Sequence, residues 1–172
     1  MRFGDFLRAT VLLSGGTATL LATLTVIGLS REYDRSLILF SAGWWIAAVV
    51  IGAWLGRRAE TSPPIARLLA TARTQTSLPE LRPGLTLINR LWPLMLVTFG
   101  AAVLGVFEPQ ASSVAAGFAI IWALAWRRQD AAVVAIEERD GARFYVDRTS
   151  PLQPIRLVRT PGFGGAFLTY HP

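Results

Sequence analysis

The 172-residue chain contains no cysteine, and its only histidine is His171. Disulfide bonds, thiolate zinc sites and cysteine-held iron–sulfur clusters are therefore excluded within the chain. A single histidine also excludes bis-histidine haem ligation and a metal site with several histidine ligands. We therefore expect no cofactor, and most redox functions are excluded.

Lysine is also absent, so all 17 basic residues are arginine, and the net charge is +6. A basic balance often indicates nucleic-acid binding. Here the arginines lie at the ends of apolar runs and in the segments between them, which fits anionic lipid head groups better. We expect membrane lipids, and no nucleic acid, among the partners.

The sequence contains four long apolar runs, and none of them has an ionisable residue in its central part. Hydrophobic residues make up 52% of the chain, and the mean hydropathy is +0.43. A soluble domain of this size cannot hide so much apolar surface, whereas about 20 apolar residues in a helix cross a bilayer. The expected fold class is an all-α integral membrane protein. It has four transmembrane helices in two hairpins (about 9–29, 36–56, 86–107 and 112–127), a short cytoplasmic surface helix and a C-terminal β-hairpin.

Some of these runs allow a second interpretation. Residues 9–29 follow Arg2 and Arg8, as the h-region of a signal peptide would, but they are too long and lead into a poor cleavage site. The third and fourth runs are short, so a re-entrant pair is the alternative to two full crossings. Pro93 is expected inside the third helix, where proline favours a kink.

The arginines predict the orientation. Placing both termini in the cytoplasm leaves only Arg31 and Arg35 outside and the other 15 arginines inside, as the positive-inside rule requires. We expect a multi-pass protein of the plasma (inner) membrane. Residues 1–128 would form the transmembrane domain, with a cytoplasmic loop at 57–85, and residues 129–172 a cytoplasmic hairpin and tail.

Two local patterns predict structure outside the spans. Ser62-Pro63-Pro64 is typical of a helix start, and the apolar residues that follow at helical spacing indicate a short helix. This helix either lies on the membrane surface or packs on the rest of the protein. Asp140-Gly141 lies between two β-prone runs, Val133–Arg139 and Ala142–Arg148, and predicts a two-residue hairpin turn. Residues 155–159 are expected as a possible third strand.

Two sets of residues are candidates for contacts. The first consists of arginines at span ends, expected to hold lipid head groups or an acidic partner: Arg57, Arg58, Arg90, Arg127 and Arg128. The second consists of small residues that let helices approach closely: Ala48, Gly52, Gly56, Ser113 and Gly117. They would form either a seam between copies of the chain or packing within one chain.

Two further sets carry weaker signals. The first run is rich in threonine, which either lines a polar path or hydrogen-bonds its own helix: Thr10, Thr17, Thr19, Thr23 and Thr25. Glu32, Asp34 and Glu108 share the expected outer side and would either bind a divalent ion or be ordinary loop charges. No Ser–His or P-loop arrangement is present.

The function expected from these features is a non-catalytic accessory or scaffolding subunit of a membrane protein complex. Its partners would be lipids and other membrane subunits or copies of itself. One alternative is a small oligomeric pore or transporter lined by the threonines. A lipid-modifying enzyme that uses the outer acids is the other.

Overall fold

The computed structural model describes residues 1–32, 34–58, 60–75, 83–147 and 153–161. The chain divides into two compact units. The helical unit comprises Arg8–Arg58 and Leu91–Arg128, and the sheet unit comprises Met1–Leu7, Ala59–Arg90 and Gln129–Pro172.

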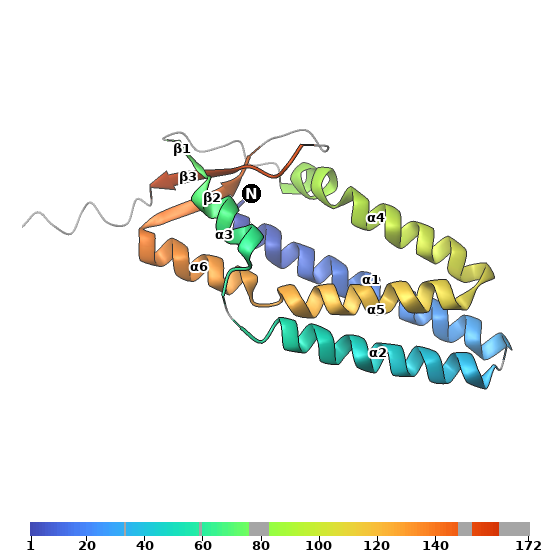
Figure 1. The fold of residues 1–172 in the computed structure, drawn as a ribbon. Coiled ribbons are helices and arrows are strands. Elements are labelled where there is room, and N and C mark those ends of the chain that lie inside the picture. The colour runs from blue at the N-terminus through green and yellow to red at the C-terminus, as the bar shows by residue number, and fades with distance from the viewer. Residues whose placement is uncertain (33, 59, 76–82, 148–152, 162–172) are drawn as a thin grey trace, which may run out of the picture. The chain divides into compact units, whose positions relative to one another are not determined.

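Four helices are long and apolar enough to cross a membrane. These helices are α1 (Phe3–Glu32), α2 (Arg35–Leu55), α4 (Pro83–Phe107) and α5 (Pro109–Trp126), as Figure 1 shows. Four apolar helices in a mostly helical chain agree with the prediction from hydropathy. The α4 helix begins three residues before the expected Thr86, so it is longer than its apolar core requires.

The helix boundaries follow from local chemistry. The Asp34 side chain accepts a hydrogen bond from the Ser36 N–H (2.8 Å) and so caps α2. Pro109 occupies the first position of α5, where a missing N–H costs nothing. Pro93 lies inside α4 as expected, and cannot donate the helical hydrogen bond to the Asn89 carbonyl.

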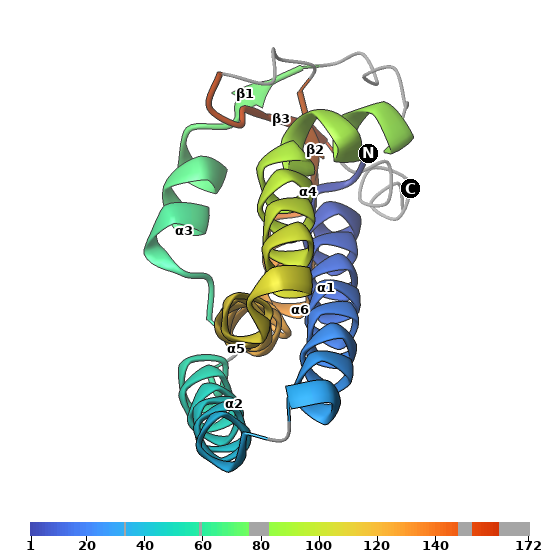
Figure 2. The same ribbon diagram turned by 90° about the vertical axis from the view of Figure 1, so that its right-hand side faces the viewer.

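Within the helical unit, α5 contacts the other three helices (Figure 2). Its closest neighbour is α2. Thr25 of α1 and Ser112 of α5 share a buried hydrogen bond of 2.9 Å. A Cβ placed at Gly105 of α4 would lie 2.6 Å from the Ser112 Cβ, so only glycine allows α4 this close. We conclude that α5 is the central helix of the unit.

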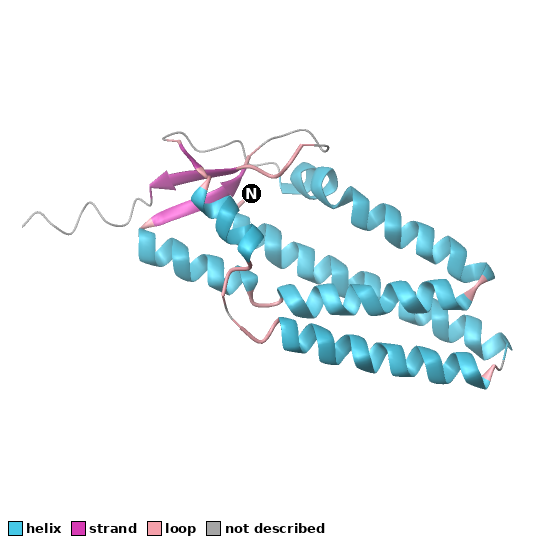
Figure 3. Ribbon diagram, viewed as in Figure 1, coloured by secondary structure: helices cyan, strands magenta, loops and turns pink. Residues whose placement is uncertain are grey.

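The sheet unit contains a three-stranded sheet in the order β1-β3-β2 (Figure 3). The strand β3 (Leu157–Pro161) pairs parallel with β1 (Arg73–Thr74) and antiparallel with β2 (Ala142–Val146). Residues at the start of the chain join the β2 edge, since the Met1 carbonyl accepts the Val146 N–H (3.0 Å). The sheet therefore draws on the beginning, the middle and the end of the chain.

The predicted C-terminal hairpin is wrong in its first strand. Residues expected as a strand from Val133 belong to the helix α6 (Gln129–Asp140). The buried and half-buried side chains of α6 recur at helical spacing, which the alternating pattern of a strand would not give. They are Gln129, Asp130, Ala132, Val133, Ile136 and Glu137. Gly141 has φ +57° and so ends a helix rather than turning a hairpin.

The antiparallel partner of β2 is instead the later strand, β3. The two runs on either side of Asp140-Gly141 therefore do not pair with each other across a two-residue turn. The third strand expected near residues 155–159 is present, displaced to Leu157–Pro161.

The short helix in the central loop is confirmed as α3 (Pro63–Ala70). Its Ile65 is buried within the protein, as expected if the helix packs on the rest of the chain. Gln129 of α6 fixes its start. The Gln129 side chain accepts the Ser62 N–H (3.0 Å) and donates to the Glu60 carbonyl (3.1 Å).

Candidate functional site

Four of the five candidate arginines gather at one end of the α2–α5 pair. Arg57 and Arg58 follow α2, and Arg127 and Arg128 follow α5. The Arg128 guanidinium donates a hydrogen bond of 2.6 Å to the Arg57 carbonyl, which joins the two helix ends. All four side chains are exposed. The result is a cluster of four positive charges, which we call the arginine cluster.

Arg57 is further held by Trp54. Its guanidinium carbon lies 5.3 Å from the centroid of the Trp54 ring, within the range of a cation–π contact. The fifth candidate, Arg90, belongs to the sheet unit. Its guanidinium donates a hydrogen bond of 2.5 Å to the Gln153 carbonyl, so part of its donor capacity is used inside the protein.

The candidate small residues lie where α2 and α5 of the same chain meet. Ala48 is fully buried, and a Cβ placed at Gly52 would lie 3.0 Å from the Ile121 Cα. Cβ atoms at Gly56 and Gly117 would overlap the Leu124 backbone and the Trp44 ring, respectively. These positions therefore serve packing within the chain.

Hydrogen bonds reinforce the same contact. The fifth small residue, Ser113, donates through its hydroxyl to the Ser41 hydroxyl (2.8 Å). Its carbonyl accepts the Trp45 indole N–H (3.0 Å), and the Val114 carbonyl accepts the Trp44 indole N–H (3.2 Å). Both indoles of α2 are therefore anchored on α5.

The threonines of α1 do not share one face. Thr19 and Thr23 are exposed, whereas Thr25 is buried. These three hydroxyls donate to carbonyls four residues earlier, at 2.8 to 3.0 Å. Bonding to the same helix is therefore confirmed at these positions.

Of the three outer acids, the Glu32 side chain lies outside the described part of the structure, so only Asp34 and Glu108 can be placed. No group of three or more histidine, aspartate or glutamate side chains in the described part could hold a metal ion. The Asp34 carboxylate accepts hydrogen bonds from the Ser36 hydroxyl (2.7 Å) and from the Ser36 backbone N–H. These two bonds, the hydroxyl bond above all, hold the pKa of Asp34 below its ordinary value.

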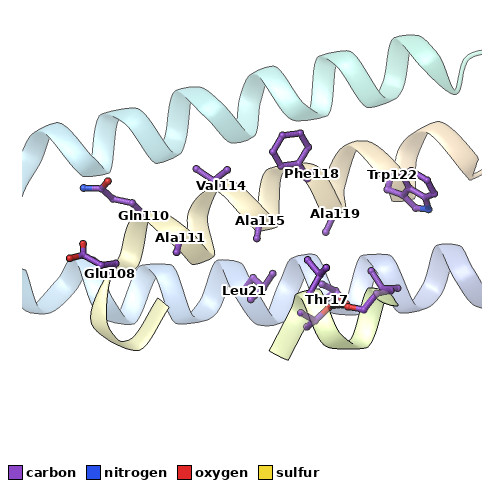
Figure 4. A pocket seen from close by; sticks show the side chains of 13 residues that line it. Thr17, Leu21, Glu108, Gln110, Ala111, Val114, Ala115, Phe118, Ala119 and Trp122 are labelled. Atoms are coloured by element: carbon purple, nitrogen blue, oxygen red, sulfur yellow. Dashed lines mark hydrogen bonds between the residues drawn. The ribbon is translucent and has the colours of Figure 1, made fainter. Parts of the chain in front are cut away.

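An apolar groove lies between α1, α4 and α5, entirely within the helical unit, with a volume of about 800 Å³. Ala111, Ala115 and Ala119 point to the same side of α5 and form its floor, as Figure 4 shows. Phe118 and Trp122 add aromatic surface, and they remain 60% and 50% exposed. The groove is thus open along its length.

The two ends of the groove differ in chemistry. Glu108 and Gln110 lie at one end and Trp122 at the other (Figure 4). Between them the Thr17 and Thr98 hydroxyls lie 3.3 Å apart, and Thr98 donates to the Leu94 carbonyl (2.7 Å). The hydroxyls in the wall are therefore paired, and the groove offers hydrocarbon along its length and polar groups at one end.

Sequence reasoning missed this groove. Its signal is the alanine repeat at every fourth position from Ala111 to Ala119, which places small side chains on one helix face. The same repeat is typical of any close contact between helices. The alanine face of α5 is uncovered only because of where α1 and α4 lie, which the repeat does not indicate.

Comparison with protein-family models, curated proteins and solved structures found no match for this chain. The geometry of the helical unit is therefore the basis for a functional proposal.

Proposed function

We propose that this protein is a non-catalytic accessory or scaffolding subunit of a membrane protein complex. Its helices would pack in the bilayer against larger partners or other copies of the chain. Its basic face would hold anionic lipid head groups or an acidic partner. The plasma (inner) membrane, with both termini cytoplasmic, is the proposed location.

The observation that carries this proposal is the arginine cluster. Two helices end side by side in arginine pairs, and the Arg128–Arg57 hydrogen bond holds those ends together. Arginine near an anionic membrane surface contributes about 1 kcal/mol of attraction. Four exposed guanidinium groups in one place therefore favour an anionic surface as their neighbour.

The hydrogen bonding of the helical unit favours a scaffold over a pore. A pore lined by α1 needs its hydroxyls to face one water-filled path. Thr19 and Thr23 bond their own helix on an exposed face, while Thr25 bonds Ser112 in the interior. The threonines therefore serve packing in different directions.

The first experiment is gentle solubilisation from the native membrane, followed by a native gel and mass spectrometry of the proteins that co-purify. A complex with other subunits supports the proposal. A particle that contains only this chain, or a chain that is not membrane-bound, contradicts it.

A second experiment tests the arginine cluster. We compare thermal stabilisation by anionic and zwitterionic lipids for the purified protein and for a variant with glutamine at all four positions. The variant should lose most of the extra stabilisation that anionic lipid gives, because its guanidinium groups are gone. A control with Arg67→Gln and Arg73→Gln, two exposed arginines outside the cluster, should keep it. Equal behaviour of both variants would contradict head-group binding by the cluster.

A further inference from the structure

We infer that the groove between α1, α4 and α5 binds one acyl chain of a zwitterionic phospholipid whose ammonium head group meets Glu108. This inference rests on the proposed membrane insertion and not on the accessory role.

The dimensions of the groove match one leaflet. From Gln110 to Trp122 the lining residues of α5 extend over about 18 Å, at 1.5 Å per residue. One leaflet of a bilayer has about 15 Å of hydrocarbon, half of the total core. A phospholipid acyl chain that enters at the Gln110 end therefore covers most of the length of the groove.

The volume distinguishes a lipid chain from a partner helix. The groove holds about 800 Å³. A helix segment of the same length, with a diameter of about 10 Å, occupies about 1,400 Å³. A helix would seat only one face in the groove, whereas a hydrocarbon chain fits inside it and contacts the alanine floor along its length.

The charges at the polar end match a zwitterionic head group. Glu108 makes no capping hydrogen bond with its side chain and is exposed, so its carboxylate is available to an ammonium group. Gly28 of α1 packs against Pro109, because a Cβ there would lie 2.8 Å from the Pro109 Cγ. Arg31 follows Gly28 by about one helical turn and is exposed, so the residue lies at this end of α1. We expect its guanidinium to bind the lipid phosphate.

The groove wall favours hydrocarbon over a polar ligand. Thr17 and Thr98 are bonded to each other, and Thr98 also bonds its own helix. An occupant therefore meets no unpaired hydroxyl at this point in the wall. Polar recognition is left to Glu108 and Gln110 at the end.

The test uses the full chain in nanodiscs that contain phosphatidylethanolamine with a photoreactive diazirine in the acyl chain. After irradiation, mass spectrometry maps the adducts. We expect them to concentrate on groove residues such as Ala115 and Phe118, above the level on exposed residues of α2 such as Ile46 and Val50. Equal labelling of both surfaces would overturn the inference.

Two alanine-to-leucine variants test the shape. Ala115→Leu fills the floor and should remove most adducts from the groove. Ala42→Leu, the same change at an exposed position of α2, should leave them unchanged. Should Ala115→Leu lower the unfolding temperature strongly, Ala111→Leu replaces it at the neighbouring position of the floor. Unchanged labelling in a folded groove variant would overturn the inference.

The head group is tested by competition with unlabelled lipids. Phosphatidylethanolamine should displace the probe better than phosphatidylglycerol, and Glu108→Gln should reduce that preference about tenfold because it removes a charge-assisted hydrogen bond. No preference in the wild-type protein would overturn the head-group assignment. Cross-linking of the groove to another protein in native membranes, with no lipid adducts there, would show a partner helix as the occupant and overturn the lipid inference.

The proposed function can fail separately. Groove adducts on a chain that purifies alone would contradict the accessory role only. A complex with other subunits but without groove adducts would contradict the lipid site only.

Discussion

Glycine is used in two different ways along α2. At Gly52 an added Cβ would lie 2.9 Å from the Leu124 Cβ, closer than side-chain carbons normally approach. At Gly43, on the same helix, the added Cβ would meet nothing within 4 Å. Only the first glycine is needed for packing.

We predict opposite effects for the same substitution at these two positions. Gly52→Ala should destabilise the protein by about 1–3 kcal/mol because it overpacks the α2–α5 contact. Gly43→Ala should be neutral or stabilise by up to about 1 kcal/mol, since alanine favours the helix. Thermal or denaturant unfolding in mild detergent measures both, and equal losses would contradict this account of α2–α5 packing.

Asp34 is one residue for which the structure predicts a pH effect. Its pKa is lowered in the folded protein by the Ser36 hydroxyl and N–H, so its contribution to stability is present above its ordinary pKa. That contribution is lost as the pH falls through the lowered, folded-state value. The loss should therefore occur in strongly acidic solution.

The matching variant is Asp34→Ala, which removes the acceptor that caps α2. We expect a lower unfolding temperature than in the wild type at neutral pH. The difference between the two proteins should shrink as the pH falls below 3.8, the ordinary pKa of the group. A difference that does not change with pH would contradict the capping role of the carboxylate.

At the scale of elements, the apolar helices were predictable and the tail was not. Length and hydropathy are local properties, and they located α2, α4 and α5 to within three residues at each end. The first helix, α1, begins at Phe3, six residues before the start expected from its uncharged run. The pair Asp140-Gly141 suits both a hairpin turn and the end of a helix, because glycine adopts positive φ in both. The residues before this pair favour a helix, and their contacts with distant segments stabilise α6 over a strand.

An exposed position in α6 distinguishes helix from strand. Ala135 is exposed, and Ala135→Val should lower stability by several tenths of a kcal/mol in a helix, because β-branched residues lose rotamer freedom there. In a strand the same change would raise stability. The sign of the change in unfolding free energy is the measurement, with Ala135→Gly expected to cost about 1 kcal/mol.

The candidate sites were predictable to different degrees. The arginine pairs and small residues stand out in the sequence because they end or interrupt apolar runs. That Arg128 reaches the Arg57 carbonyl, and that Gly117 meets Trp44, depends on which helices are neighbours. The groove depends on a face of α5 that neighbours leave uncovered, and no local pattern encodes such an opening.

At the scale of the whole molecule, the absence of cysteine allows a direct test of topology. Single cysteines can be introduced by Ser30→Cys near the end of α1 and by Thr71→Cys after α3, both at exposed positions. The positive-inside rule predicts that a membrane-impermeant maleimide labels the first in intact cells. It should label the second only after the membrane is permeabilised.

The cysteine-free parent chain provides the background control for labelling. Labelling of both positions in intact cells would contradict the proposed orientation. Labelling of the Thr71 position alone would invert it.

The three-stranded sheet sets an order of events during synthesis. Arg2 pairs with Tyr145, and β1 pairs with β3, which is distant in the sequence. Because a chain is translated from its N-terminus, residues 1–2 and 73–74 leave the ribosome long before their strand partners exist. The apolar helices can meet the insertion machinery in turn, but the sheet closes only after Pro161 has been made. A nascent chain stopped before β3 would therefore have its helices without the sheet, and it would be a natural target for quality-control proteases.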